Sequence, residues 1–256
     1  ANDDKVVGLQ SQLAQQLNQM ASRLTELDNL KNEFIANISH ELRSPLAAME
    51  GYIPLLSLEG SASPQTRENL ARMQVNLTRL RRLVENLLEI SRIEARQVQN
   101  RPESVDVRET AREVCDLFAL QLKTRKLTLE VQIPEDASRA YADPAKLRQI
   151  LINLMDNAIK YNSLGGEVRI TSKTDANLLQ LAFHDTGPGI RPEHINGLFK
   201  RFQRLPPASP ELAQAKGAGL GLAISRSLAR MMGGDIRFER ETGRGSAFTL
   251  SLPLRG

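Results

Sequence analysis

The stretch that decides the fold of this chain reads Leu147-Arg-Gln-Ile-Leu-Ile-Asn-Leu-Met-Asp-Asn-Ala-Ile-Lys-Tyr161. Apolar residues recur there every three or four positions, which predicts an amphipathic helix with one face in a core. That core face holds Ile150, Leu151, Leu154, Ala158 and Ile159. The other side of the helix holds Asn153, Asn157, Lys160 and Tyr161. Asparagine is a poor helix former, so two of them inside a helix indicate either a ligand site or an ordinary solvent face.

Two glycine-rich segments further along the chain favour the ligand site. Asp185-Thr-Gly-Pro-Gly189 follows a predicted strand, and Gly217-Ala-Gly-Leu-Gly221 precedes a predicted helix. Glycines let backbone N–H groups approach phosphates at a helix N-terminus. The second segment does not directly follow a strand, which argues against a dinucleotide-binding fold. Asp185 could accept a hydrogen bond from the amine of adenine, and the Asn157 oxygen is a hard ligand suited to Mg²⁺.

Around these motifs, residues 105–256 alternate between helical and extended patterns. Helices are predicted near 106–123, 144–162 and 217–232. The strands carry alternating apolar residues at Leu127/Leu129/Val131/Ile133, Val168/Ile170, Leu179/Leu181/Phe183, Ile236/Phe238 and Phe248/Leu250/Leu252. The pattern predicts an α/β domain whose mixed sheet carries helices on one face, with Asn177 in a hairpin turn.

Other segments of this domain have simpler interpretations. Residues 205–216 are rich in Pro, Ala and Ser and are interpreted as a mobile lid or a disordered loop between the glycine motifs. His184 is interpreted as a strand-end residue and His194 as an exposed helix residue, neither of them catalytic. Cys115 is expected to be buried packing.

The first hundred residues are predicted to be helical. Apolar residues with heptad spacing begin at Leu13, and no Pro or Gly interrupts residues 9–44. After the breaker Glu59-Gly-Ser-Ala-Ser-Pro64, a second apolar seam comprises Leu70, Met73, Leu77, Leu80, Val84 and Leu87. Two helices joined by a turn have too little core to stand alone, so we expect dimerisation into a four-helix bundle. Residues 98–104 are interpreted as a linker.

The first helical segment contains one histidine, within the octet Ser39-His-Glu-Leu-Arg-Ser-Pro-Leu46. His40 falls off the apolar seam and is expected to face solvent. Its neutral imidazole is a good nucleophile when one ring nitrogen is held protonated, which the Glu41 carboxylate could do. Pro45 either kinks the helix or opens a new one capped by Ser44. The apolar pattern continues beyond the proline, which favours the kink.

Composition excludes several functional classes. The net charge is +4, aromatic residues make up 4% and Trp is absent, so nucleic-acid binding is not expected. A hydrophobic fraction of 41% supports a core, but no apolar run is long enough to cross a membrane. The single cysteine excludes an internal disulfide and fits a reducing compartment.

Together, these motifs resemble those of bacterial sensor histidine kinases of the two-component type, across nearly the full chain. The octet around His40 is similar to the H-box of that family. The motifs of its ATP-binding domain correspond to residues 153–161 (N-box), 185–190 (G1 box), 198–202 (F-box), 217–221 (G2 box) and 243–248 (last Gly-box). Residues 8–24 resemble the closing helix of a HAMP linker. That likeness implies a transmembrane sensor upstream of a cytoplasmic kinase portion.

The resemblance implies a fold in two parts, an all-α dimeric helical hairpin followed by an α/β sandwich of the histidine kinase, gyrase and chaperone type. The domains it implies are 1–30 (end of a HAMP-like linker and coiled coil), 31–98 (dimerisation and histidine phosphotransfer), 99–104 (linker) and 105–256 (catalytic ATP-binding domain).

The resemblance also implies that ATP binds the second part and that His40 takes its γ-phosphoryl group. The group would then pass to an aspartate in the receiver domain of a response regulator. Mg²⁺ would be held by Asn157 and adenine read by Asp185. Lys160, Tyr161 and Arg204 would contact phosphates. The resemblance gives as further cofactor-binding residues Asn153, Gly187, Gly189, Gly217, Gly219, Leu220, Gly221 and Ser246.

In this family, the acid after the histidine and a hydroxyl or amide three residues beyond that acid support dephosphorylation of the regulator. Glu41 and Ser44 stand at those positions. Ser44 replaces the commoner Thr or Asn, and Ser246 replaces the usual Thr.

Two other functional classes remain as alternatives. A gyrase-, chaperone- or mismatch-repair-type ATPase would use water as the nucleophile with a carboxylate such as Asp156, but the helical segment around His40 argues against it. A non-catalytic dimeric scaffold would have no need of His40, Asn157, Asp185 and the glycines of the G2 box.

Overall fold

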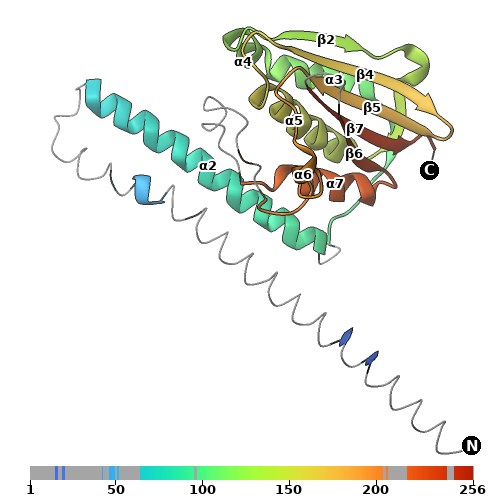
Figure 1. Cartoon of the computed structure of the whole chain (residues 1–256), viewed down its shortest axis with the longest axis horizontal. Helices are drawn as coiled ribbons and strands as arrows, with labels where there is room; N and C mark the ends of the chain where they lie inside the picture. Colours follow the sequence, from blue (N-terminus) through green and yellow to red (C-terminus); the bar gives the residue numbers. More distant parts are fainter. Residues whose placement is uncertain are drawn as a thin grey trace, which may run out of the picture. The chain divides into compact units, whose positions relative to one another are not determined.

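The computed structural model of this chain describes residues 15–16, 19–20, 42, 46–49, 51, 64–94, 97–203, 206, 218–240 and 245–255 (Figure 1). It divides into two compact units, Ala1–Leu83 and Val84–Gly256. Some predicted functional residues lie outside the described residues, namely His40, Glu41, Ser44, Arg204 and Gly217. The same holds for Pro45 and for all but one residue of the predicted lid.

Helix α2 (Pro64–Glu94) begins at the proline of the predicted breaker segment, where a missing backbone N–H costs no helical hydrogen bond. The described residues before it are helical, as predicted. Leu70 and Leu77 of the predicted seam are 52% and 54% exposed in the single chain. Part of this apolar seam is therefore uncovered within one chain.

The second unit holds the remaining elements. Its helices are α3 (Val107–Leu117), α4 (Ala119–Thr124), the 3₁₀ turn η1 (Glu135–Ala137), α5 (Pro144–Lys160), α6 (Pro192–Ile195) and α7 (Gly221–Met231). Its strands are β1 (Glu103–Asp106), β2 (Thr128–Gln132), β3 (Arg139–Ala142), β4 (Glu167–Asp175), β5 (Leu178–Asp185), β6 (Asp235–Arg240) and β7 (Ser246–Pro253).

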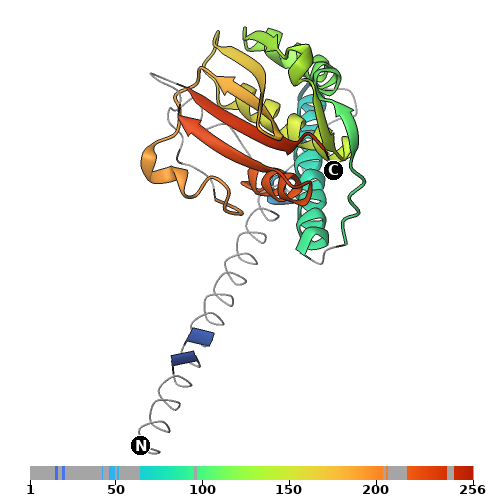
Figure 2. The same ribbon diagram turned by 90° about the vertical axis from the view of Figure 1, so that its right-hand side faces the viewer.

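Five of these strands form a mixed sheet in the order β2-β4-β5-β7-β6. Strand β2 runs parallel to β4, and the other neighbours are antiparallel. Figure 2 shows α3, α5 and α7 on one side of this sheet, as the sequence predicts. The remaining strands, β1 and β3, form a separate antiparallel pair.

The core lies between the sheet and these helices. Most of the sheet residues that face the helices are at most 1% exposed, namely Val168, Ile170, Leu179, Leu181, Phe183, Ile236, Leu250 and Leu252. All five predicted core residues of α5 are buried against them. The pairing places Phe183 opposite both Ile170 and Phe248, so large side chains from three strands meet beneath α5. Helix α5 is therefore fixed at the centre of the unit.

Several boundaries differ from prediction. The sequence did not indicate β1 and β3, whose buried residues include only the small Ala140 and Ala142 in place of large alternating side chains. The predicted linker therefore ends inside β1 at residues 103–104. The predicted helix at 106–123 breaks at Phe118, which is buried, while Leu120 is 75% exposed.

The start of α7 also shifts, to Gly221 from the predicted residue 217. Gly219 has a φ of +67°, which no residue of a right-handed helix adopts. The predicted turn at Asn177 is confirmed, since residues 176–177 join β4 to β5. None of the described helices combines the length and apolar character needed to span a bilayer.

Candidate functional site

Helix α5 carries most of the polar residues singled out in the sequence. Asp143 caps its start, because one carboxylate oxygen accepts hydrogen bonds from the backbone N–H groups of Ala145 and Lys146 at 3.1 and 3.2 Å. The helix ends at Lys160, and the N–H of the next residue, Tyr161, donates to the Asn157 carbonyl at 3.0 Å. These boundaries place Asn157 and Lys160 in the last turns of the helix.

The two asparagines of α5 have different surroundings. The Asn153 amide donates to Ser225 Oγ of α7 at 2.8 Å. A Cβ added at Gly221 would lie 2.1 Å from Asn153 Oδ1, so a larger residue there would displace the Asn153 side chain. Asn153 thus joins α5 to the first turns of α7. Within the described part of the chain, the Asn157 side chain has no hydrogen-bond partner.

This environment suits a magnesium ligand at Asn157. The described residues contain no group of three His, Cys, Asp or Glu side chains able to hold a metal ion. Mg²⁺ commonly keeps several waters and binds through one or two protein oxygens together with substrate phosphates. Asn157 is half-buried and its side chain has no partner among the residues that the structure describes, so its amide oxygen fits Mg²⁺ that arrives with a phosphorylated substrate.

Lys160 and Tyr161 end the polar side of α5. The Lys160 ammonium lies 4.9 Å from the centre of the Tyr161 ring, a cation–π contact. Tyr161 is 43% exposed. The pair presents a positive charge and an aromatic edge next to Asn157, which suits a phosphate group.

The segment after β5 packs against this end of α5. Asp185 is buried, and its Oδ1 accepts a hydrogen bond from the Gly187 N–H at 2.9 Å. A Cβ at Gly187 would lie 2.5 Å from the Tyr161 carbonyl oxygen, so the two backbones approach as closely as glycine permits. Asp185 also faces Ser246 across the β5–β7 pairing, and Ser246 is buried.

Two positive-φ glycines complete the same region. Gly189 has a φ of +73°, and a Cβ there would lie 3.0 Å from the Gly245 carbonyl. Gly219 accepts a hydrogen bond from the Phe202 N–H at 3.0 Å. Leu220, 1% exposed, then anchors the N-terminus of α7 in the core. The backbone before α7 is thereby held against the segment that ends at Phe202.

The sequence did not single out Arg226, which attaches α7 to strand β6. Its guanidinium donates to both Asp235 oxygens at 2.7 and 3.0 Å and lies 4.4 Å from the centre of the Phe199 ring. Arg226 holds the pKa of the Asp235 carboxyl well below its usual range. A charged residue on a predicted helix gives no signal of such a role, because its partner on β6 is known only from the fold.

The structure thus brings together the described candidates from α5, the β5–α6 segment, the start of α7 and β7. The other two histidines are interpreted as not catalytic. His184 Nε2 lies 3.1 Å from Thr171 Oγ1 on β4, and His194 is half-buried in α6, not exposed as predicted. Cys115 is buried as predicted, and burial raises the pKa of its thiol to about 11.

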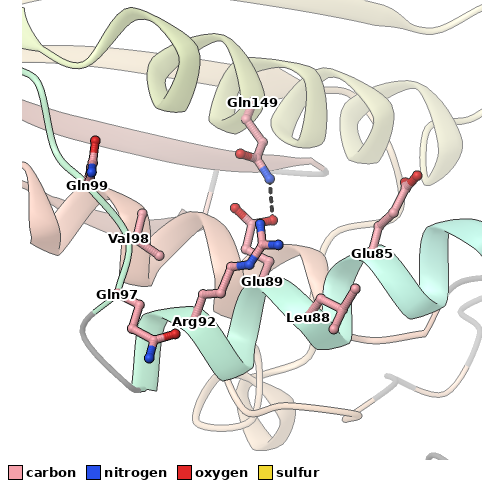
Figure 3. A pocket seen from close by; sticks show the side chains of 8 residues that line it. All are labelled: Glu85, Leu88, Glu89, Arg92, Gln97, Val98, Gln99 and Gln149. Carbon is pink, nitrogen blue, oxygen red and sulfur yellow. Dashed lines mark hydrogen bonds between the residues drawn. The ribbon is translucent and has the colours of Figure 1, made fainter.

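A separate hollow of about 660 Å³ opens on the second unit (Figure 3). It is lined by Glu85, Leu88, Glu89, Arg92, Gln97, Val98, Gln99 and Gln149. Figure 3 shows the Gln149 amide directed at Glu89, to which it donates a hydrogen bond at 2.5 Å. It shares no residue with the candidate site described above, so we assign no nucleotide to it.

Two family models match the chain. Residues 30–96 match the His Kinase A (phospho-acceptor) domain. Residues 142–256 match the histidine kinase-, DNA gyrase B- and HSP90-like ATPase. The first match contains His40, and the second contains every described candidate residue from Asn153 to Ser246.

Similar curated proteins are longer than this chain. Hybrid signal transduction histidine kinase D of Dictyostelium discoideum is 32% identical over 245 residues, which are 93% of this chain and 16% of that protein. Sensor protein SrrB of Staphylococcus aureus is 33% identical over 235 residues, 89% of this chain and 39% of SrrB. The chain therefore spans less than half the length of these relatives.

Solved structures of similar fold include the histidine kinase AdeS of Acinetobacter baumannii. It is 27% identical with a TM-score of 0.68, over 85% of this chain and 98% of AdeS. Full-length ShkA in complex with AMPPNP is 28% identical with a TM-score of 0.63, over 87% of this chain and 46% of ShkA. The α/β unit described above is the ATPase fold of these proteins.

Proposed function

This chain belongs to the histidine kinase family, and from that premise we propose that it is an ATP-dependent protein histidine kinase of two-component signalling. His40 takes the γ-phosphoryl group of ATP and passes it to an aspartate on a response regulator. The observation that carries the proposal is the order of the two matched regions. A phospho-acceptor region containing His40 precedes an ATPase domain that contains the candidate nucleotide residues.

The proposed reaction has two transfers. In the first, a neutral His40 ring nitrogen attacks the γ-phosphorus, an N–P bond forms, and the bond to the β–γ bridging oxygen breaks to release ADP. Glu41 accepts a hydrogen bond from the other ring nitrogen and fixes the tautomer. In the second, a carboxylate oxygen of the regulator's aspartate attacks the phosphorus, and the N–P bond breaks.

In this proposal the second unit binds ATP through three groups of residues. Asp185 accepts a hydrogen bond from the adenine amine, with Ser246 beside it. Lys160, Tyr161 and Arg204 contact the phosphates. The glycine segment at 217–221 brings backbone N–H groups to the phosphates at the start of α7, an 11-residue helix whose N-terminus favours anions.

Magnesium belongs to the same proposal, with Asn157 as its protein ligand. Mg²⁺ held there would supply neutralisation of the charge on the transferring phosphoryl group. The absence of a protein partner for the Asn157 side chain among the described residues supports this role. Asn153, by contrast, supports the site indirectly, because its hydrogen bond to Ser225 joins α5 to α7.

The proposed partners follow from the family. Two copies associate through the helical seams, and the apolar exposure of Leu70 and Leu77 in a single chain supports this. The receiver domain of a response regulator accepts the phosphoryl group. Glu41 and Ser44 support the later dephosphorylation of that regulator. The likeness of residues 8–24 to a HAMP helix supports a role as the cytoplasmic portion of a membrane-anchored sensor.

The decisive experiment follows the phosphoryl group. The full chain and its His40→Gln variant are incubated with γ-labelled ATP and Mg²⁺, and the label on each protein is tested for acid and alkali stability. We expect acid-labile, alkali-stable label on the parent chain, because an N–P bond has those properties, and none on His40→Gln.

A control distinguishes loss of the acceptor from loss of the nucleotide. His40→Gln should bind ATP with the same affinity as the parent chain, because the nucleotide site lies in the second unit. Absence of label on both proteins, with equal rates of ATP hydrolysis, would instead assign the chain to the ATPases that use water as nucleophile. ATP binding without any turnover would favour the scaffold.

A further inference from the structure

Asn162 directly follows Tyr161, and none of the roles assigned above uses it. It is 1% exposed. Its amide Nδ2 donates to the Glu167 carbonyl at 2.9 Å. Its Oδ1 accepts hydrogen bonds from the Ser163 N–H at 2.9 Å and from Thr186 Oγ1 at 3.2 Å. A buried amide with this many partners fixes the backbone around it.

Thr186 provides the other half of this arrangement and lies between Asp185 and Gly187. Its hydroxyl accepts a hydrogen bond from the Glu167 N–H at 2.8 Å while donating to Asn162. Its own backbone N–H donates to the Glu167 carbonyl at 3.2 Å. Asn162 and Thr186, which we call the Asn162–Thr186 pair, therefore connect the end of α5, the start of β4 and the end of β5.

Asn162 is enclosed by its neighbours, while Thr186 is exposed and is held by its hydrogen bonds. A Cβ at Gly166 would lie 2.5 Å from Asn162 Oδ1 and 2.6 Å from Thr186 Oγ1. Arg125 Nη2 also donates to the Asn162 carbonyl at 2.8 Å. On the other side, Gly187 lies against the Tyr161 carbonyl and donates to Asp185 Oδ1. A rotation of the backbone at Thr186 would move the Gly187 N–H and with it the direction of the Asp185 carboxylate.

We propose that the Asn162–Thr186 pair positions the Asp185 carboxylate for the amine of adenine and so sets the preference for adenine over a base with a carbonyl at that position. The inference rests on the proposed function, in which Asp185 reads adenine. A site built to accept a hydrogen bond from an amine rejects a base that presents an acceptor there, because two acceptors then face each other. That rejection requires a fixed carboxylate.

The test compares the dissociation constants of ATP and inosine triphosphate, which carries a carbonyl in place of the amine, measured by calorimetry on the full chain. In Thr186→Val, which keeps the shape of the side chain but lacks the hydroxyl, we expect ATP to bind about tenfold more weakly. The affinity for inosine triphosphate should stay nearly unchanged, so the preference for ATP falls by the same factor. Thr186→Ser should restore the parent preference.

Ser163→Ala is the matched control. It removes a hydroxyl from the same exposed loop but leaves the backbone N–H that donates to Asn162, so both affinities should equal those of the parent chain. Asn162→Ala tests the other member of the pair, with the thermal unfolding midpoint measured alongside. Because Asn162 is buried with several partners, the conservative Thr186 variants decide the outcome if Asn162→Ala does not fold.

Two results would overturn the inference, and they are distinguishable. If Thr186→Val weakens both nucleotides equally, or neither, the pair supports the loop without setting the base preference. If Asp185→Asn leaves the ratio of the two affinities at the parent value, Asp185 does not read adenine. The proposed role of Asp185 then fails, and the positioning role fails with it.

Discussion

Asn153 and Asn157 show how two identical residues on one helix acquire different roles from their neighbours. The sequence places both on the polar side of α5 and cannot separate them, because four residues bring them to the same face. In the fold, Asn153 meets α7 and donates to Ser225 at 2.8 Å, while Asn157 has no described partner. Their substitutions should therefore affect different properties.

Asn157→Ala should abolish detectable autophosphorylation but leave the free energy of unfolding within about 0.5 kcal/mol, since no described hydrogen bond is lost. Asn153→Ala should lower that free energy by about 1 kcal/mol, the worth of a typical hydrogen bond. Urea unfolding of both variants, together with labelling by γ-labelled ATP, checks the pair. Full activity in Asn157→Ala would contradict the proposed magnesium ligand.

Asp235 gives a prediction about acid stability. Hydrogen bonds from Arg226, and a weaker one from Arg230, lower the pKa of this carboxyl despite its partial burial. A carboxyl whose pKa is lower in the folded state stabilises the fold above its unfolded pKa of about 4, and that contribution is lost as the pH falls below it.

We expect Asp235→Asn to reduce the free energy of unfolding by about 1–2 kcal/mol at pH 7, because a charge-assisted pair is weakened. The difference from the parent chain should shrink as the pH falls below about 4. Urea unfolding between pH 7 and pH 3 measures this. Asp175→Asn, an exposed carboxyl on the β4–β5 hairpin, is the control and should stay within about 0.5 kcal/mol of the parent. A difference for Asp235→Asn that does not vary with pH would contradict the assignment.

At the scale of elements, hydrogen bonds attach part of the predicted linker to the rest of the second unit. Lys146 Nζ donates to the Gln99 carbonyl at 2.5 Å and to Asp143 at 2.7 Å. Asp143 also accepts from the Arg101 N–H at 2.9 Å, and Asn100 donates to the Met231 carbonyl at 3.1 Å. Burial raises the pKa of Asp143, but the hydrogen bonds from Lys146 and Arg101 outweigh it and lower that pKa.

Lys146→Met should therefore lower the free energy of unfolding by about 3 kcal/mol, because it leaves the buried Asp143 charge without its cation. The Arg101 amide should also exchange its hydrogen faster. Adding Asp143→Asn should recover most of the stability, since Asn still caps α5 and carries no charge. The stability that is not recovered reflects the lost hydrogen bond to Gln99 together with the one from the Arg101 N–H, because Asn has only one acceptor oxygen and uses it to cap α5. Equal urea midpoints for the parent and Lys146→Met would contradict this view of the linker.

The elements that were predicted well have large apolar residues at regular spacing. Helix α5 and the central strands repeat such residues, so their faces could be assigned before the fold was known. The β1–β3 pair could not, because its buried contacts come from Ala140 and Ala142, which leave no periodic signal. The roles of Arg226 and Asn162 were also unpredictable, because each depends on a partner from a distant strand or turn.

At the scale of the whole molecule, the proposed reaction separates the acceptor from the nucleotide. His40 belongs to the first unit and the candidate ATP residues to the second. A change that affects only the association of two chains should therefore leave ATP binding intact. The exposed seam of α2 offers that change, because Leu70 and Leu77 are seven residues apart and lie on one face of the helix.

We expect Leu77→Arg to convert the protein from a dimer, twice the 28.5 kDa of one chain, to a monomer in light scattering. A charge in the centre of an apolar seam must be desolvated for the helices to pack. The affinity for ATP should be unchanged.

Val75→Arg is the matched control: Val75 is 69% exposed but lies off the seam, so a dimer should persist. If the parent chain is itself a monomer at micromolar concentration, the exposed leucines have another role and the four-helix bundle is wrong for this chain. If both variants dissociate, the contact surface extends beyond the seam, because Val75 lies on the opposite side of the helix.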